Sequence, residues 1–445
     1  MTGKDFYPVV FKAWVYPLTA LTMLCHPVYA QQVANQPSAG EALKYVEPNQ
    51  QSRVESIAIE DEELPEFIDG TSFVLKPRTY YLNRDRDSRP DNVGWALGGA
   101  LEYKSGWWRQ KIRAAATLYT SQKLYGPSDK DGTLLFMPGP DAFTVLGEAN
   151  ITWRFAKNQG MRFGRQRFEL PYLGSHDIRM VPNTFEAIAV GNKSPTGMAY
   201  IAGYVDSIKR KNDDEFIAMS EATGASGDNE GVIFAAARYA VKNGMLAGAT
   251  YQRTPDVFDT FFAKIEHPIF SGSGKKIKGF LQYTSQRSIG DERIGEFDTS
   301  LIAGKLELKD RNTTWRVALS TTDEDSGIQK PYGNPANYLS VIVDDFDRAG
   351  EDAWLVGISY DFKRIGIGDM SMFANVVSGN TPDSGANVSP DETEYDITVD
   401  YSIKEGWANK LWLRVRAAYI DQDEDVGGDD FLDFRIIANY EFDML

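Results

Sequence analysis

The sequence predicts an all-β protein, a transmembrane antiparallel β-barrel of about 18 strands over residues 72–445. Two observations lead to this fold class. Apolar and polar side chains alternate in one short segment after another, which is typical of strands with one face toward lipid and one toward a polar lumen. The gaps between the segments alternate short and long, as expected when short periplasmic turns and longer external loops connect the strands.

Residues 1–30 have the pattern of a signal peptide. Lys4 and Lys12 lie in a basic start, an apolar run covers 13–25, and small residues close the segment at Ala30. A membrane anchor is the alternative, but the apolar run is too short and contains Pro17. Lipidation at Cys25 is disfavoured because Leu24 is too bulky for the residue expected there.

Cleavage after Ala30 would remove the single cysteine and leave 45 basic and 62 acidic residues, a net charge of −17. Disulfides would then be excluded, and an acidic chain of this kind argues against nucleic acid as a partner. Residues 31–71 are polar and acidic without a sustained period, so we expect a mostly disordered periplasmic extension.

The strands follow from the alternation. Trp95, Leu97 and Leu101 share one face of their segment, with glycine and alanine on the other face. In the segment 142–156 we expect Phe143, Val145, Ile151, Trp153 and Phe155 to share a face. The expected strands start near 72, 93, 109, 142, 160, 182, 197, 230, 244, 256, 275, 294, 312, 351, 369, 392, 407 and 431.

The last strand carries a further signal. Phe434, Ile436, Ala438, Tyr440 and Phe442 alternate, and such an aromatic end resembles the segment that barrel-assembly machinery reads in outer-membrane proteins. Three further residues, 443–445, follow where that signal usually ends.

Basic side chains lie opposite the apolar faces of several strands, where they would line the lumen. Fixed guanidinium groups can bind a carboxylate in two-point fashion and pass it to a neighbouring site. The alternative to such a substrate path is a lumen in which basic and acidic side chains merely neutralise one another and stay solvated. The predicted basic ladder consists of Lys111, Arg113, Arg154, Arg238, Arg316, Lys410, Arg414, Arg416 and Arg435.

The segment 168–182 combines Pro171, Gly174 and Pro182 with apolar side chains too numerous for a solvated loop. A loop folded into the barrel would explain both features; a lid over the mouth is the alternative. The predicted constriction residues are Tyr172, Ser175, His176, Asp177 and Arg179.

Two motifs resemble the OprD family of substrate-specific porins. They are Tyr-Tyr-Leu-Asn-Arg-Asp at 80–85 and Gly-Ser-His-Asp-Ile-Arg-Met-Val-Pro-Asn-Thr-Phe-Glu at 174–186. The resemblance implies an 18-stranded channel, narrowed by its third loop (168–182) and seventh loop (323–351), for small solutes that often carry a carboxylate. The acidic extension departs from that family.

Other classes of function find little support. Ser175, His176 and Asp177 are consecutive and cannot form a catalytic triad, which needs groups from separate elements. No zinc spacing or phosphate-binding glycine loop occurs, so we expect no cofactor and no metal. The acidic run 421–430 mimics a calcium loop but has Leu432 where a bidentate Glu is needed.

The sequence therefore predicts a porin in the outer membrane of a Gram-negative bacterium, in contact with lipid and lipopolysaccharide, as a monomer or a trimer. It would take up small water-soluble solutes, carboxylates in particular. An exporter of an anionic polysaccharide and a structural or adhesive surface barrel with a closed pore are the alternatives.

Overall fold

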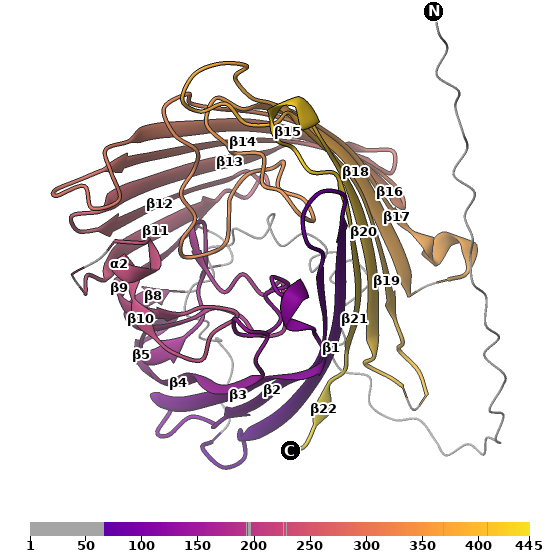
Figure 1. The fold of residues 1–445 in the computed structure, drawn as a ribbon. Helices are drawn as coiled ribbons and strands as arrows, with labels where there is room; N and C mark the ends of the chain where they lie inside the picture. Colours follow the sequence, from indigo (N-terminus) through magenta and orange to yellow (C-terminus); the bar gives the residue numbers. More distant parts are fainter. Residues whose placement is uncertain are drawn as a thin grey trace, which may run out of the picture. The chain divides into compact units, whose positions relative to one another are not determined.

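A computed structural model gives the fold, and it describes residues 66–445 except 193, 195, 196, 226, 228, 368 and 407. Eighteen long strands, each antiparallel to its neighbours, close into a barrel (Figure 1). The fold class predicted from the alternation is confirmed. The expected signal peptide, and the expected extension up to residue 65, lie outside the described residues.

The long strands begin within five residues of their expected starts. They are β1 (Ser72–Arg86), β2 (Asn92–Lys104), β3 (Ile112–Tyr125), β4 (Phe143–Ala156), β5 (Gln159–Gln166), β8 (Thr184–Asn192), β9 (Gly197–Lys209), β11 (Val232–Ala240), β12 (Leu246–Thr254), β13 (Phe258–Gly272), β14 (Lys275–Ser288), β15 (Asp298–Asp310), β16 (Thr313–Thr322), β17 (Asp352–Asp361), β18 (Met370–Asn380), β19 (Glu392–Ser402), β20 (Trp412–Gln422) and β21 (Phe431–Asn439).

Shorter elements lie in the connections. They are the strands β6 (Glu169–Leu170), β7 (Leu173–Gly174), β10 (Ile217–Ala218) and β22 (Phe442–Asp443), the helix α2 (Met219–Ala222), and the 3-10 turns η2 (Ser128–Lys130), η3 (Phe362–Ile365) and η4 (Glu424–Val426). None of the helices in the described part of the chain is long and apolar enough to cross a bilayer.

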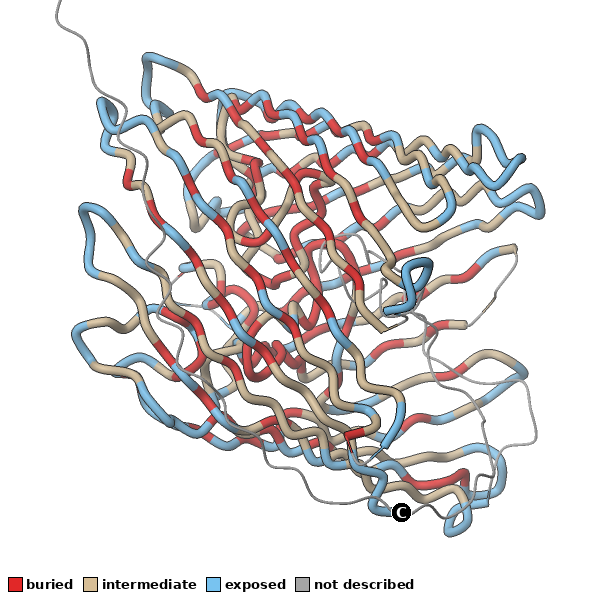
Figure 2. The backbone as a smooth tube through the Cα atoms, turned by 90° about the vertical axis from the view of Figure 1, so that its right-hand side faces the viewer, coloured by how far each residue is buried: buried red, intermediate tan, exposed pale blue. Residues whose placement is uncertain are grey.

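The alternation along β16 shows how the sequence builds the wall. Trp315, Val317 and Leu319 are exposed on the outer face, whereas Arg316, Ala318 and Ser320, which alternate with them, are buried on the inner face. The same alternation of buried and exposed residues runs along strand after strand (Figure 2). Apolar side chains therefore cover the outside of the barrel, whereas the inside carries polar side chains together with the apolar ones that pack against the inward-folded loops.

The prediction that five residues of the segment 142–156 share one face is wrong. Phe143 and Val145 are buried inside the barrel, whereas Ile151, Trp153 and Phe155 on the same strand are exposed outside it. The register between β3 and β4 shifts beside Gly147, where β4 carries an extra residue. Such a β-bulge moves every later side chain to the opposite face, and strict alternation cannot reveal it.

The barrel closes between its first and last long strands. β1 pairs with β21 from Arg78 to Arg86, and the short β22 continues that edge along Val74 and Leu75. Short turns join the strands at one end and long loops at the other. Parts of the purple and orange loop segments lie inside the ring of strands, where they narrow the lumen (Figure 1).

Candidate functional site

The third long loop, residues 167–183 between β5 and β8, enters the barrel as a small hairpin. β6 and β7 pair within it, and Tyr172 at its tip has a positive φ of 58°. Leu170 and Leu173 are fully buried in one apolar cluster with Phe185 of β8 and Phe234 of β11. The apolar residues that made this loop unusual in the sequence thus pack against the inner wall.

The seventh long loop, residues 323–351 between β16 and β17, lies along the third. The backbone N–H groups of Tyr172 and Gly174 donate to the carbonyls of Asn334 and Tyr332, at 2.9 and 3.0 Å. The Asn334 amide donates to Glu169 at 3.0 Å and accepts from the His176 N–H at 3.0 Å. The two loops therefore form one hydrogen-bonded unit inside the lumen.

The third loop is also bound to β1 and to the loop between β3 and β4. Arg78 of β1 donates to both carboxylate oxygens of Asp177, at 2.6 and 3.2 Å. Arg179, which is buried, donates through Nε to the Thr133 carbonyl at 2.9 Å. Hydrogen bonds of charged side chains thus fix the position of the third loop along the barrel axis.

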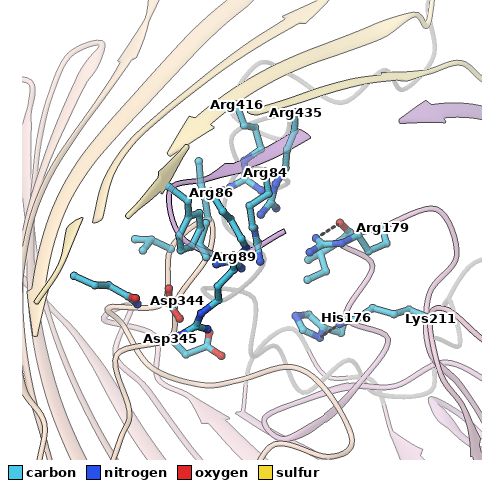
Figure 3. A pocket seen from close by; sticks show the side chains of 16 residues that line it. Arg84, Arg86, Arg89, His176, Arg179, Lys211, Asp344, Asp345, Arg416 and Arg435 are labelled. Atoms are coloured by element: carbon cyan, nitrogen blue, oxygen red, sulfur yellow. Dashed lines mark hydrogen bonds between the residues drawn. The ribbon is translucent and has the colours of Figure 1, made fainter. Parts of the chain in front are cut away.

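A cavity of about 380 Å³ lies between the two loops and the wall (Figure 3). Strands β1, β20 and β21 supply one side, and the third and seventh loops, together with Arg89 after β1 and Lys211 after β9, supply the others. Its lining is Arg84, Arg86, Arg89, His176, Ile178, Arg179, Lys211, Val341, Ile342, Val343, Asp344, Asp345, Arg416, Gln422, Phe431 and Arg435.

Several of the lining cations already have carboxylate partners in the wall. Asp433 lies between Arg84 and Arg435, at 2.9 and 2.5 Å, and Asp429 accepts from Arg86 at 2.8 Å. Phe431 forms a cation–π contact with Arg86, whose guanidinium carbon lies 4.4 Å from the ring centroid. These pairs hold the arginine side chains in fixed positions.

Three lining cations, Arg179, Lys211 and Arg416, form no ion pair within the described residues. Arg416 donates to the Thr398 hydroxyl at 3.1 Å, and Lys211 lies 3.2 Å from Nδ1 of His176. Arg416 is 5% exposed and Arg179 is 7% exposed. Since a buried charge without a counter-ion is costly, this part of the cavity favours an incoming anion.

The loop groups in the cavity have shifted pKa values. Burial, with the nearby charge of Arg179, lowers the pKa of Lys211 to about 7. Burial and the charge of Lys211 hold the pKa of His176 well below its usual value, so its ring is neutral near pH 7. Burial beside Arg435 lowers the pKa of Arg179 to about 10, which leaves that guanidinium charged at neutral pH.

The cavity contains four of the residues singled out from the sequence: His176, Arg179, Arg416 and Arg435. Arg414 lies two residues before Arg416 on β20 and donates to both oxygens of Asp400, at 2.7 and 3.0 Å. In the third loop, Tyr172 donates to or accepts from the Thr284 hydroxyl, and the Ser175 hydroxyl donates to Glu169.

The other basic residues lie outside this cavity. Arg113 stacks on Trp107, Arg238 donates to the Ser194 carbonyl at 3.4 Å, and buried Arg316 donates to the Ser359 hydroxyl at 2.5 Å. Arg154 is near the end of β4. Lys111 and Lys410 lie in turns between strands, and Lys410 pairs with Asp443.

Sequence reasoning missed Arg84, Arg86, Arg89 and Lys211. Arg84 and Arg86 follow Tyr80 and Leu82 at a spacing of two, so alternation in β1 offered a signal. That signal was masked because Tyr80 and Leu82 make this inner face apolar where it meets Met180 and Val181 of the third loop. Arg89 and Lys211 lie in loops, for which the sequence pattern gives no position.

Comparison with known proteins gives consistent results. A family model described as outer membrane porin, OprD family, matches residues 65–444. Porin D of Pseudomonas aeruginosa is 22% identical over 425 residues, covering 85% of this chain and 92% of the relative.

Solved structures show the same fold. The crystal structure of Pseudomonas aeruginosa OpdK with vanillate matches with a TM-score of 0.75 and 22% identity, over 85% of this chain and 100% of that one. Pseudomonas aeruginosa OccK9 matches with a TM-score of 0.77, 22% identity and the same coverage. Acinetobacter baumannii OccAB1 matches with a TM-score of 0.77 and 18% identity, over 87% of this chain and 100% of that one.

Proposed function

Because this chain belongs to the OprD family of outer membrane porins, we propose that it takes up small solutes carrying a carboxylate through the cavity between its third and seventh loops. The single observation that carries the proposal is the group of cations without ion-pair partners, Arg179, Lys211 and Arg416. A solute carboxylate would supply the counter-charge that the described residues do not.

The arrangement of the arginine side chains also favours passage of a solute through the channel over tight binding. A guanidinium binds a carboxylate through two parallel hydrogen bonds, but Arg435 lies directly opposite Arg416 in the β20–β21 pairing and offers a second position. Conduction requires sites that bind well enough to be entered and weakly enough to be left. Arg414, two residues before Arg416 on β20, continues this basic wall beyond the cavity.

The size of the cavity favours a small solute. About 380 Å³ falls in the range of small-molecule sites, and it would hold an aromatic monocarboxylate such as the vanillate in the OpdK crystal. An exporter of a polysaccharide would need a wider lumen, and the hydrogen-bonded contact between the two loops argues against one.

The test is the ion selectivity of single channels in a planar bilayer under a salt gradient. Arg416→Glu replaces an unpaired cation in the cavity by an anion, so the ratio of anion to cation permeability should fall about fivefold or more, which corresponds to ~1 kcal/mol. Vanillate should block the wild-type current at millimolar concentration, and the uncharged vanillyl alcohol should not.

Arg311→Glu is the matched control, because Arg311 is exposed in the turn between β15 and β16. It should leave the selectivity unchanged. Equal selectivity in the wild type and Arg416→Glu would contradict the proposal, as would equal block by the acid and the alcohol.

A further inference from the structure

A cluster of three carboxylates lies at the edge of the cavity. Asp344 comes from the seventh loop, and Glu392 and Glu394 come from one face of β19. One oxygen of each lies within 4.8 Å of the others. Glu392 is 4% exposed and Glu394 is fully buried, so water screens this negative charge poorly.

The loop backbone is wrapped around Glu394. Its carboxylate accepts from the N–H groups of Ile342, Val343 and Asp344, at 3.0 to 3.3 Å. This contact places the Asp344 side chain over β19. The loop path and the strand face therefore bring the three acids together, although they are far apart in the sequence.

Glu392 has one oxygen that the protein does not satisfy. Its Oε2 accepts from the Gln422 amide at 2.7 Å, but its Oε1 is buried and accepts from no N–H or hydroxyl group of the described residues. A buried carboxylate oxygen without a donor is costly, and it is rare in native proteins. Among the described residues, only a proton held by the neighbouring Asp344 carboxyl could satisfy it; a bound cation would do so with all three acids ionised.

Arg348, which acts electrostatically on Asp344 and Glu392, makes its hydrogen bonds elsewhere. Arg348 donates to Glu351 at 2.6 Å and to the Pro390 carbonyl at 2.6 Å. Within the described residues, none of the three clustered acids forms an ion pair. Up to three negative charges thus meet in a confined space without a cation.

We propose that Asp344, Glu392 and Glu394 bind a hard divalent cation, with Ca²⁺ the ion that fits best. Carboxylate oxygens are the preferred ligands of Ca²⁺, which accepts them one or two at a time in flexible geometry. Asp344 also lines the cavity, so water from the lumen can complete the coordination shell. The free Oε1 of Glu392 is the oxygen left available for the ion.

Such an ion would have two effects on the channel. It would bind the seventh loop to β19 through Asp344, and so fix one side of the cavity. It would also neutralise negative charge beside the anion path, where Asp344 and Asp345 face the arginines of β1 (Figure 3).

The experiment is equilibrium dialysis of the refolded protein in detergent, free of lipopolysaccharide, against radioactive Ca²⁺ at pH 7.5. We expect the wild type to bind one more Ca²⁺ per chain than Glu392→Gln does at the same free concentration. Glu405→Gln is the matched control, because this exposed glutamate in the turn between β19 and β20 lies outside the cluster and outside the acidic run 421–430. It should bind as the wild type does.

Asp344→Asn provides a second variant, which keeps the test decisive if Glu392→Gln does not fold. Folding is checked by the heat-dependent electrophoretic mobility of the barrel. Equal Ca²⁺ binding by the wild type and either folded cluster variant would overturn the proposal, and so would a wild type that binds no Ca²⁺ at 1 mM. Neither result depends on which solute the channel conducts.

Discussion

Lys211 is the cavity residue whose charge changes near neutral pH. Its Nζ contacts His176, and Arg179, Arg435 and Asp345 act on it electrostatically. With a pKa of about 7, the ammonium is charged at pH 6 and neutral at pH 8. The preference for anions should therefore fall about twofold as the pH rises across this interval.

The measurement is the reversal potential under a salt gradient at pH 6, 7 and 8. Lys211→Arg keeps its charge and should retain the pH 6 selectivity at pH 8, whereas Lys211→Met should show the lower selectivity throughout. If Lys211→Met shows the same change of selectivity with pH as the wild type, another group titrates and the prediction is wrong.

Individual site residues were predictable where a strand carried them between apolar neighbours, or where a loop was too apolar for solvent, as at His176 and Arg179. Arg416 and Arg435 were found because their neighbours alternate cleanly with apolar side chains on the opposite face. Lys211 and Arg89 were not found, since loops have no period that relates a position in the sequence to a direction in space. Their place depends on packing against other loops.

At the scale of elements, the contact between the third and seventh loops sets the size of the cavity. A Cβ atom on Gly174 would lie 1.7 Å from Nδ2 of Asn334, so Gly174→Ala must displace the Asn334 side chain that joins the two loops. We expect larger and noisier single-channel currents, because the hydrogen bonds of Asn334 to Glu169 and His176 would be lost or strained.

Gly304→Ala is the matched control for this substitution. Gly304 lies in β15, and a Cβ there meets only the Phe280 carbonyl oxygen, at 3.9 Å. Its currents should equal those of the wild type. If Gly174→Ala also conducts as the wild type does, the loop contact does not limit the current.

The strands were predictable almost completely from the sequence, and the reason is physical. Lipid on one side and a polar lumen on the other impose a period of two on every strand. The expected start at 294 came four residues early because Ile294 packs its side chain onto an apolar cluster from within a loop. The bulge at Gly147 was missed because a single extra residue leaves both halves of β4 regular.

At the scale of the whole molecule, the outer apolar surface should determine stability in a bilayer. Val317 is 51% exposed in the middle of β16, between Trp315 and Leu319. Val317→Arg places a charge in lipid and should lower the free energy of unfolding by roughly 2–4 kcal/mol. Denaturant unfolding in lipid vesicles measures this change.

Thr313→Arg is the control, because Thr313 lies on the same face at the end of β16 next to a turn. Near the interface the cost should be only about 0–1 kcal/mol. Equal losses at both positions would mean that the outer face of β16 does not cross the lipid interior as the fold implies.

The pairing of β1 with β21 also constrains how the chain is made. Phe431 lies opposite Arg86, so nearly the whole polypeptide must be synthesised before the first strand meets its final neighbour. Contacts so distant along the chain form slowly, and until then the free edge of β1 exposes unpaired backbone groups that can recruit another chain. Biogenesis of this barrel therefore includes an obligatory waiting period, during which the nascent chain must be chaperoned against aggregation.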